Sequence, residues 1–193
     1  MISRLFLWGL LFSFVKGSDA DQDSLKSGLQ FYLWKTVTVD LVQYQYGQTF
    51  SEEISISFID SNSYLIGSSQ QDIFVSGSII KTLNRQTDQL IIDQRLVDNG
   101  DVFSLLNGNI DQLTLENRRN EKGLITFDIS MVEIGISGTV TVKENSWHFH
   151  SMTLNYDEEN WIKISEKSWQ ILRGVYSFEN FGSSSKEVID LRE

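Results

Sequence analysis

The chain has 193 residues, about the length of one domain, and 40% of them are hydrophobic and 12% aromatic. This composition can bury a core and excludes an intrinsically disordered chain. The formal net charge is −10, and the first 17 residues carry two bases, Arg4 and Lys16, and no acid, so the remainder is at −12. This argues against nucleic acid or anionic lipid as the main partner, because phosphate groups are bound by clustered Lys and Arg.

Residues 1–17 have the pattern of a secretory signal peptide. Arg4 supplies the positive start, residues 5–15 form an apolar run, and Val15 and Gly17 precede a cleavage point before Ser18. The run is too short to cross a hydrocarbon layer of about 30 Å, although an uncleaved N-terminal anchor helix is the alternative. We therefore expect a secreted, extracellular or luminal chain with no membrane span after signal removal.

Three absences narrow the classes further. Without cysteine the chain has neither a disulfide framework nor a cysteine-ligated zinc site. Without proline it can form long strand ladders. No asparagine stands in an Asn-x-Ser/Thr acceptor, so N-glycosylation is not expected. We expect no cofactor.

The remaining chain divides into a polar leader at 18–28, expected to be loose, and a single β-rich domain at 29–193. Apolar and polar residues alternate over 36–41 and over 54–58, which is the pattern of half-buried strands. Residues 87–99 have the best helical periodicity of the chain, although we still assign them to a strand. Further strands are predicted at 72–80, 89–93, 102–106, 112–116, 123–130, 132–137, 139–143, 147–154, 160–165, 168–172 and 187–191.

Parts of this pattern recur. The stretch "DVFSLLNGNIDQLTLEN" at 101–117 returns about sixty residues later as "NWIKISEKSWQILRG". Recurring short strands with Asn and Gly between them favour a solenoid whose successive turns pair in parallel. The alternative is an antiparallel β-sandwich or barrel, because a chain rich in Val, Ile and Thr produces similar echoes.

Two family resemblances follow from these stretches. "VFSLLNGNIDQLTLENRRN" and "WIKISEKSWQILRGVYSFENF" resemble turns of the right-handed parallel β-helix of pectin-lyase-like domains, most closely those of secreted and surface proteins of protists. The resemblance covers about residues 54–193 and implies a coil of parallel sheets, without implying catalysis. "LITFDISMVEIGISGTVTVKENSWHFHSMTLNY" with "GVYSFENF" resembles the luminal β-domain of the vacuolar proton pump's accessory subunit, although its cysteines, glycan acceptors and membrane anchor are lacking.

Candidate binding residues are acidic and aromatic. Asp98 and Asp101 form an acidic pair in "DNGD", and paired carboxylates can act on sugars, although such a stretch is also an ordinary turn. Trp147, Trp161 and Trp169 can stack on sugar rings or serve as core packing.

The two histidines are the candidates for a metal site. His148 and His150 lie two residues apart, so on a strand they would share one face and hold zinc or copper with a third ligand. An exposed pair without a metal is the alternative, and we expect no metal.

The sequence therefore predicts a secreted or surface β-solenoid that binds or builds structure without catalysis. Its candidate partners are a carbohydrate, another protein, or a second copy at an uncapped solenoid end. The alternatives are a polysaccharide lyase or hydrolase of the same fold and a luminal accessory subunit of a membrane complex such as the vacuolar proton pump.

Overall fold

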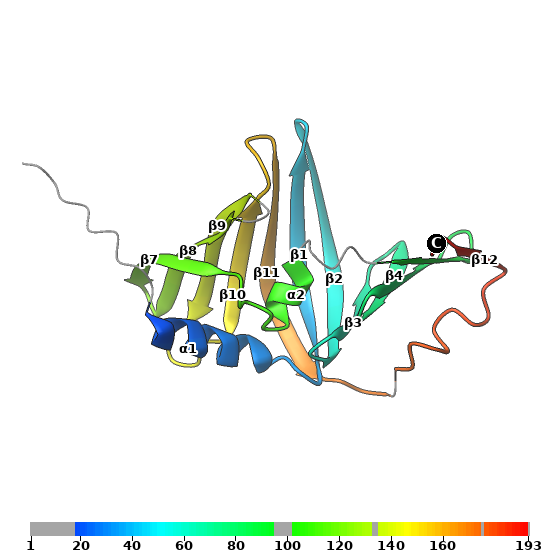
Figure 1. Ribbon diagram of the computed structural model, residues 1–193, viewed down its shortest axis with the longest axis horizontal. Coiled ribbons are helices and arrows are strands. Elements are labelled where there is room, and N and C mark those ends of the chain that lie inside the picture. The colour runs from blue at the N-terminus through cyan, green and yellow to red at the C-terminus, as the bar shows by residue number, and fades with distance from the viewer. Residues whose placement is uncertain (1–17, 95–101, 133–134, 175, 193) are drawn as a thin grey trace, which may run out of the picture.

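The protein is all-β, with one large sheet and two short helices (Figure 1). The structure is a computed structural model and describes residues 18–94, 102–132, 135–174 and 176–192. The helices are α1 (Asp19–Gln30) and α2 (Val102–Leu106). The strands are β1 (Lys35–Gln45), β2 (Gln48–Asp60), β3 (Ser63–Gly67), β4 (Gln71–Ser76), β5 (Ile79–Asn84), β6 (Gln89–Gln94), β7 (Thr114–Glu121), β8 (Leu124–Met131), β9 (Ile136–Lys143), β10 (Phe149–Asn155), β11 (Asn160–Ile171) and β12 (Glu187–Asp190).

The described strands form a single open sheet in the order β12-β6-β5-β4-β3-β2-β1-β11-β10-β9-β8-β7. Two runs of hairpins, β1 to β6 and β7 to β11, meet where β1 pairs with β11 along its whole length. Every described pair is antiparallel except β6 with β12.

The predicted right-handed parallel β-helix is therefore wrong. A solenoid needs long crossovers between parallel strands, whereas tight turns here reverse the chain. The turn from β1 to β2 is made by Tyr46 and Gly47 alone, with φ of 47° and 81°, which is the backbone of a two-residue hairpin. The alternative expectation of an antiparallel fold is nearer, although the structure has one open sheet instead of a sandwich.

The apparent repeat also fails. Residues 102–106, expected as a strand, form α2, while the similar stretch at 160–171 is the single long strand β11. A short apolar run does not distinguish a strand from a buried helical turn, because both bury every side chain.

The leader at 18–28, expected to be loose, is mostly helical. Ser18 caps α1: its hydroxyl accepts from the Asp21 backbone N–H at 3.2 Å, and the Asp21 carboxylate accepts from the Ser18 N–H at 3.3 Å. Leu25 and Leu29, four residues apart, are 1% and 0% exposed. The helix thus places one narrow apolar stripe on the sheet.

The two helices lie on the same face of the sheet, which we call the helix-covered face (Figure 1). The core lies between this face and the helices. The ends of β1, β2 and β11 extend beyond the helices at the top of Figure 1. Among the described residues, no helix is long and apolar enough to cross a membrane.

Residues 176–192, which we call the C-terminal strap, bind the other end of the sheet. Phe178 and Phe181 meet the buried Phe74 ring edge-on, at centroid distances of 5.2 and 5.5 Å. The Lys81 ammonium donates to the Phe178 carbonyl at 2.6 Å. The strap then adds β12 in parallel to β6.

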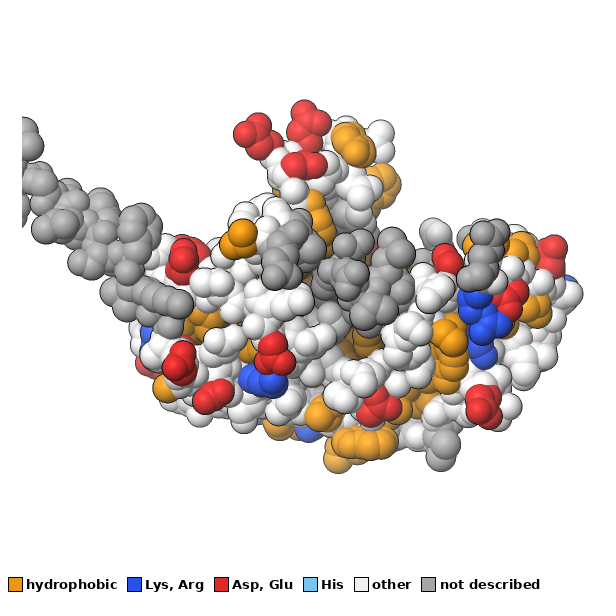
Figure 2. Space-filling view, in the orientation of Figure 1, with side chains coloured by type: hydrophobic (Ala, Val, Ile, Leu, Met, Phe, Trp, Pro, Cys, Tyr) orange, Lys and Arg blue, Asp and Glu red, His pale blue; other side chains and the backbone are white. Residues whose placement is uncertain are grey.

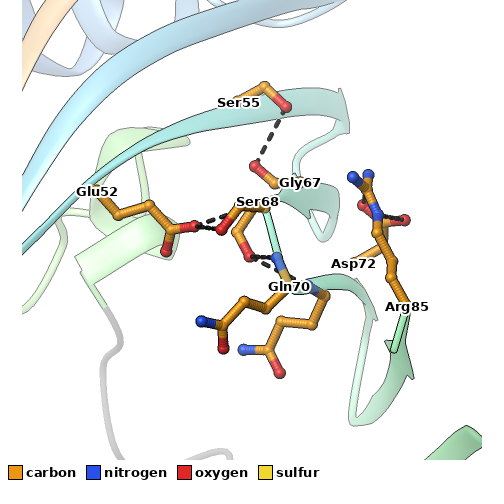
Figure 3. A network of polar contacts seen from close by, with 9 residues as sticks. Glu52, Ser55, Gly67, Ser68, Gln70, Asp72 and Arg85 are labelled. Atoms are coloured by element: carbon orange, nitrogen blue, oxygen red, sulfur yellow. Dashed lines mark hydrogen bonds and ion pairs between the residues drawn. The ribbon is translucent and has the colours of Figure 1, made fainter. Parts of the chain in front are cut away.

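A polar network ties β2 to the strands beyond it (Figure 3). The Ser69 backbone N–H and hydroxyl donate to Glu52 at 2.9 and 2.7 Å, and these bonds lower the pKa of Glu52. Arg85 donates two hydrogen bonds to Asp72, at 3.0 and 2.6 Å. Because Glu52 is hydrogen-bonded to Ser69 and Arg85 is paired with Asp72, we interpret the network as structural.

Candidate functional site

The helix-covered face is apolar over most of its width. On β8 the buried side chains alternate with half-buried Thr126, Asp128 and Ser130. The same alternation continues across the neighbouring strands, so the face presents a continuous apolar layer. Its buried members include Val37, Val39, Ile54, Ile56, Ile125, Phe127, Ile129, Val140, Val142, Met152, Leu154 and Ile164.

Polar contacts hold α1 over this layer at its rim. The Gln22 amide donates to the carbonyls of Ile110 and Leu113, each at 3.4 Å. Lys26 pairs with Asp111 at 2.6 Å, where both side chains are solvent-exposed. These contacts are individually weak, because exposed ion pairs contribute little.

The rim contact of Asp21 is less exposed. Its carboxylate lies 2.6 Å from the Arg118 guanidinium, and its side chain is 11% exposed. It joins the first turn of α1 to β7.

At one position α1 touches the backbone of the turn between β9 and β10. A Cβ atom added to Gly28 would lie 2.1 Å from the Trp147 carbonyl oxygen, so only glycine permits this approach. Trp147 itself has φ of 57° and stacks on Phe127, with centroids 6.0 Å apart. This contact sets the height of the helix above the sheet.

A groove of about 650 Å³ runs beside this contact, between α1 and the turn from β9 to β10. His148 and Phe31 line it, with ring centroids 3.6 Å apart in a stacked arrangement. Burial, and then the charges of Lys143 and Lys35, lower the pKa of His148 against the opposing effect of Glu166. A neutral imidazole suits stacking on an apolar ring.

Phe31 also contacts Lys35 and Trp169. The Lys35 ammonium lies 3.8 Å from the centre of its ring, and Trp169 meets the ring edge-on at 5.1 Å. A cluster of aromatic and cationic groups therefore closes the end of α1.

A buried polar network lies below this cluster. The Tyr32 hydroxyl lies 3.2 Å from both a Glu166 carboxylate oxygen and the Phe149 carbonyl, and Lys143 lies 3.0 Å from the same carboxylate. The Glu166 side chain is only 5% exposed. Burial and the charge of Glu166 raise the pKa of Tyr32 well above its ordinary value. The network compensates a buried carboxylate, which an apolar core alone would not tolerate.

The structure separates the tryptophans that the sequence singled out. Trp147 lies against Gly28 of α1, whereas Trp169 meets Phe31, the ring on which His148 stacks. Trp161 lies eight residues from Trp169 on β11, hence roughly 25 Å away, where it stacks on Tyr44. They do not form one sugar-binding platform.

The other candidates are two histidines and two aspartates. His148 precedes β10 and His150 lies within it, and among the described residues no group of three His, Asp or Glu side chains is placed to hold a metal. Asp98 and Asp101 lie outside the described residues.

Sequence reasoning missed α1 and the residues around it. Phe31, Tyr32 and Glu166 carry no motif and meet only through the fold. The capping pair Ser18 and Asp21 was the one local signal for the helix.

Comparison with solved structures identifies similar folds. An uncharacterized conserved protein from Thermus thermophilus aligns with a TM-score of 0.53 at 8% identity, over 91% of this chain and 100% of its own. A DUF1329 family protein from Desulfovibrio piger aligns with a TM-score of 0.52 at 7% identity, over 87% and 98%. A LolA superfamily protein from Nitrosomonas europaea has a TM-score of 0.42 at 10% identity, over 80% and 94%. At such identities the likeness shows the fold alone.

No protein-family model and no curated protein matches the chain. The similar structures and the antiparallel pairing overturn the resemblance to pectin-lyase-like domains, and the resemblance to the vacuolar pump subunit is not supported either. The functions inferred from these resemblances are therefore wrong as well: the repeat module, the lyase or hydrolase, and the accessory subunit. The chain is an open, mostly antiparallel sheet covered on one face by helices.

Proposed function

We propose that this protein binds an elongated apolar molecule, such as the acyl chain of a lipid, between the helix-covered face and α1. The observation that supports it best is the contrast between a wide apolar face and the small part of its cover that α1 supplies; α2 and the segment after it supply the rest, including Val102, Leu105 and Leu106. The sheet contributes buried apolar side chains from many strands, whereas α1 itself contributes only Leu25 and Leu29.

The energetics allow α1 to be displaced by a ligand. Burying two leucines stabilises the closed state by about 3–6 kcal/mol, at roughly 1.5–3 kcal/mol for each side chain. An acyl chain contributes about 0.8 kcal/mol for each buried methylene, so roughly four to eight methylenes would replace them. The rim contacts of Gln22 and Lys26 add little to this barrier. The less exposed pair of Asp21 with Arg118 must also break and adds to it.

The signal-like segment at 1–17 places this binding in the secretory pathway or outside the cell, as part of the same proposal. The groove beside Gly28 and His148 gives solvent access to the junction between α1 and the sheet. It is the side from which we expect a ligand to enter.

A displacement titration tests the proposal. The secreted protein is titrated with dansyl-labelled undecanoic acid, and unlabelled fatty acids then compete. We expect saturable fluorescence enhancement that longer chains reverse at lower concentration. Absence of saturable binding, or competition independent of chain length, would contradict an apolar site.

A cross-link tests the role of α1. The chain has no cysteine, so Lys26→Cys with Asp111→Cys can be bridged selectively by a short reagent with two thiol-reactive groups, such as a bis-maleimide. We expect bridging to weaken or slow dansyl-acid binding by at least about tenfold, since the cover can no longer move.

The matched control is Lys167→Cys with Glu53→Cys. These side chains also lie 2.6 Å apart, but both are on strands and neither touches α1. Bridging them should leave binding unchanged. If both bridges act equally, or neither acts, the ligand does not enter by displacement of α1.

A further inference from the structure

A second hollow lies at the far end of β11 from the Phe31 cluster. It has a volume of about 370 Å³ and is formed by the adjoining ends of the β1–β2 and β10–β11 hairpins. We call it the tip hollow. Its lining includes the aromatic side chains Tyr44, Tyr46, Tyr156 and Trp161 with Asp157.

The pairing of the strands brings these rings together. Tyr44 and Trp161 are register partners across β1 and β11, and their rings stack with centroids 5.8 Å apart at 12°. The Tyr46 N–H donates to the Glu159 carbonyl at 3.3 Å and so ties one turn to the other. Tyr46 and Tyr156, which are 78% and 47% exposed, come from those two turns.

The tip hollow is negatively charged. The Asp157 carboxylate accepts from the Asn160 amide at 2.8 and 2.7 Å and from the Glu159 N–H at 2.8 Å, and these bonds lower its pKa. Asp157 is therefore ionised at neutral pH, and Glu158 follows it in the same loop. Figure 2 shows acidic and hydrophobic side chains gathered on these protruding ends.

The lining of the tip hollow combines aromatic rings with a carboxylate. No lysine or arginine is among the described residues that line the tip hollow. Aromatic faces beside a carboxylate match the chemistry that recognises an alkylated ammonium group.

The backbone conformation of Tyr46 favours a binding role for its exposed ring. Tyr46 has φ of 47°, in the first central position of a two-residue hairpin where Asn is usual. Its ring is exposed and so gains little packing that would account for tyrosine in this conformation.

We propose that the tip hollow binds a quaternary ammonium group, of the kind found in choline. The cation sits against the aromatic faces and within the field of Asp157, and its methyl groups match the apolar rings. This inference does not rest on the proposed binding under α1, because the two sites share no residue.

Calorimetric titration of the secreted protein tests the charge requirement. Tetramethylammonium and choline are compared with 3,3-dimethylbutan-1-ol, which has the shape of choline without its charge. We expect both cations to bind saturably and the alcohol to bind at least about tenfold more weakly. Equal binding of choline and the alcohol, or no binding of either cation, overturns the proposal.

Three variants test the location. Asp157→Asn removes the charge at nearly constant shape, and Trp161→Leu removes one ring; each is expected to weaken choline binding at least about fivefold. Tyr46→Asn should weaken binding while the fold is retained, because Asn suits the turn. Trp34→Leu is the control, since Trp34 is also exposed and at positive φ but lies at the start of β1. An equal loss in Trp34→Leu would overturn the assignment.

Vesicle flotation identifies the source of the ammonium group. Flotation with phosphatidylcholine but not phosphatidylglycerol vesicles, reversed by free choline, would assign a lipid headgroup. Choline binding without flotation would assign a free small cation. Flotation that persists in Asp157→Asn and is insensitive to choline would contradict the site as the membrane contact.

Discussion

Tyr46 adopts a backbone conformation that favours other residues. Its φ of 47° lies in the left-handed region, where a bulky side chain costs about 1 kcal/mol relative to Asn or Gly. We therefore expect Tyr46→Asn to raise the free energy of unfolding by about 0.5–1 kcal/mol, measured by urea denaturation. Gly47→Ala is the control of opposite sign, because Gly47 has φ of 81°. A destabilised Tyr46→Asn would mean that the ring packs in a way its exposure does not indicate.

Tyr32 gives the stability of the protein a specific dependence on alkaline pH. Its pKa is raised above the ordinary value of 10.0 in the folded state, first by burial and then by Glu166. Above about pH 10 the unfolded chain therefore loses this proton while the folded chain keeps it. In that range, the ionisation of this group lowers the free energy of unfolding by up to about 1.4 kcal/mol for each pH unit. Below about pH 10, the stabilising contribution of Tyr32 is fully present.

Tyr32→Phe isolates this contribution. The variant keeps the ring but loses the hydrogen bonds of the hydroxyl, so we expect a loss of about 1–2 kcal/mol at pH 8. Denaturation curves between pH 8 and 11 should then show a shallower decline for the variant than for the parent. Parallel declines would show that Tyr32 ionises equally in both states.

At the scale of the element, α1 depends on one glycine. Alanine within a helix is ordinarily more stable than glycine by about 1 kcal/mol. At Gly28 the sign is reversed, because the new Cβ would meet the Trp147 carbonyl at 2.1 Å. We expect Gly28→Ala to lower the free energy of unfolding by about 1–3 kcal/mol, since backbone must move.

The neighbouring Ser27 supplies the control for this substitution. It is exposed on the same helix, so Ser27→Ala should be neutral or stabilising by up to about 0.5 kcal/mol. Hydrogen exchange of the α1 amides should rise in Gly28→Ala and not in Ser27→Ala. Equal exchange in both would show that α1 can lift without strain.

At the scale of the whole molecule, strands were easier to predict than their partners. Alternation over 36–41, 54–58 and 123–130 correctly predicted parts of β1, β2 and β8, because burial on one side produces it whatever strand lies alongside. The same alternation does not distinguish parallel from antiparallel neighbours. The deciding signal was the turn at Tyr46 and Gly47, which lacks the usual Asn-Gly pair.

At the candidate site, too, the sequence pattern did not show which residues meet in the fold. Trp147 and His148 were identified by residue type, and they do line the groove beside α1. Phe31 and Glu166 were not identified, because their roles arise only when β10, β11 and the end of α1 meet. Trp161 and Trp169 were grouped by type, although they lie toward opposite ends of β11.

The edge strands of the described sheet are β12 and β7, and β12, which belongs to the C-terminal strap, covers β6, which would otherwise be an edge. Phe178 and Phe181 cover Phe74, which is 2% exposed, and so position β12 along β6. Phe178 and Phe181 are half-buried, so each contributes part of the roughly 1.5–3 kcal/mol that full burial gives, whereas a four-residue parallel strand has little stability alone. Changing both to serine should therefore release the strap and expose the Phe74 ring and the edge of β6.

Exposed edges pair with other edges, so we expect this double serine variant to associate in a concentration-dependent way. Light scattering coupled to size exclusion measures the mass, and hydrogen exchange measures protection of the β6 amides. The control, with leucine at both positions, keeps the apolar contact and should behave as the parent. If the serine variant keeps the parent's mass and its β6 protection, backbone pairing of β12 alone holds the strap, and the aromatic contact at Phe74 does not protect the edge.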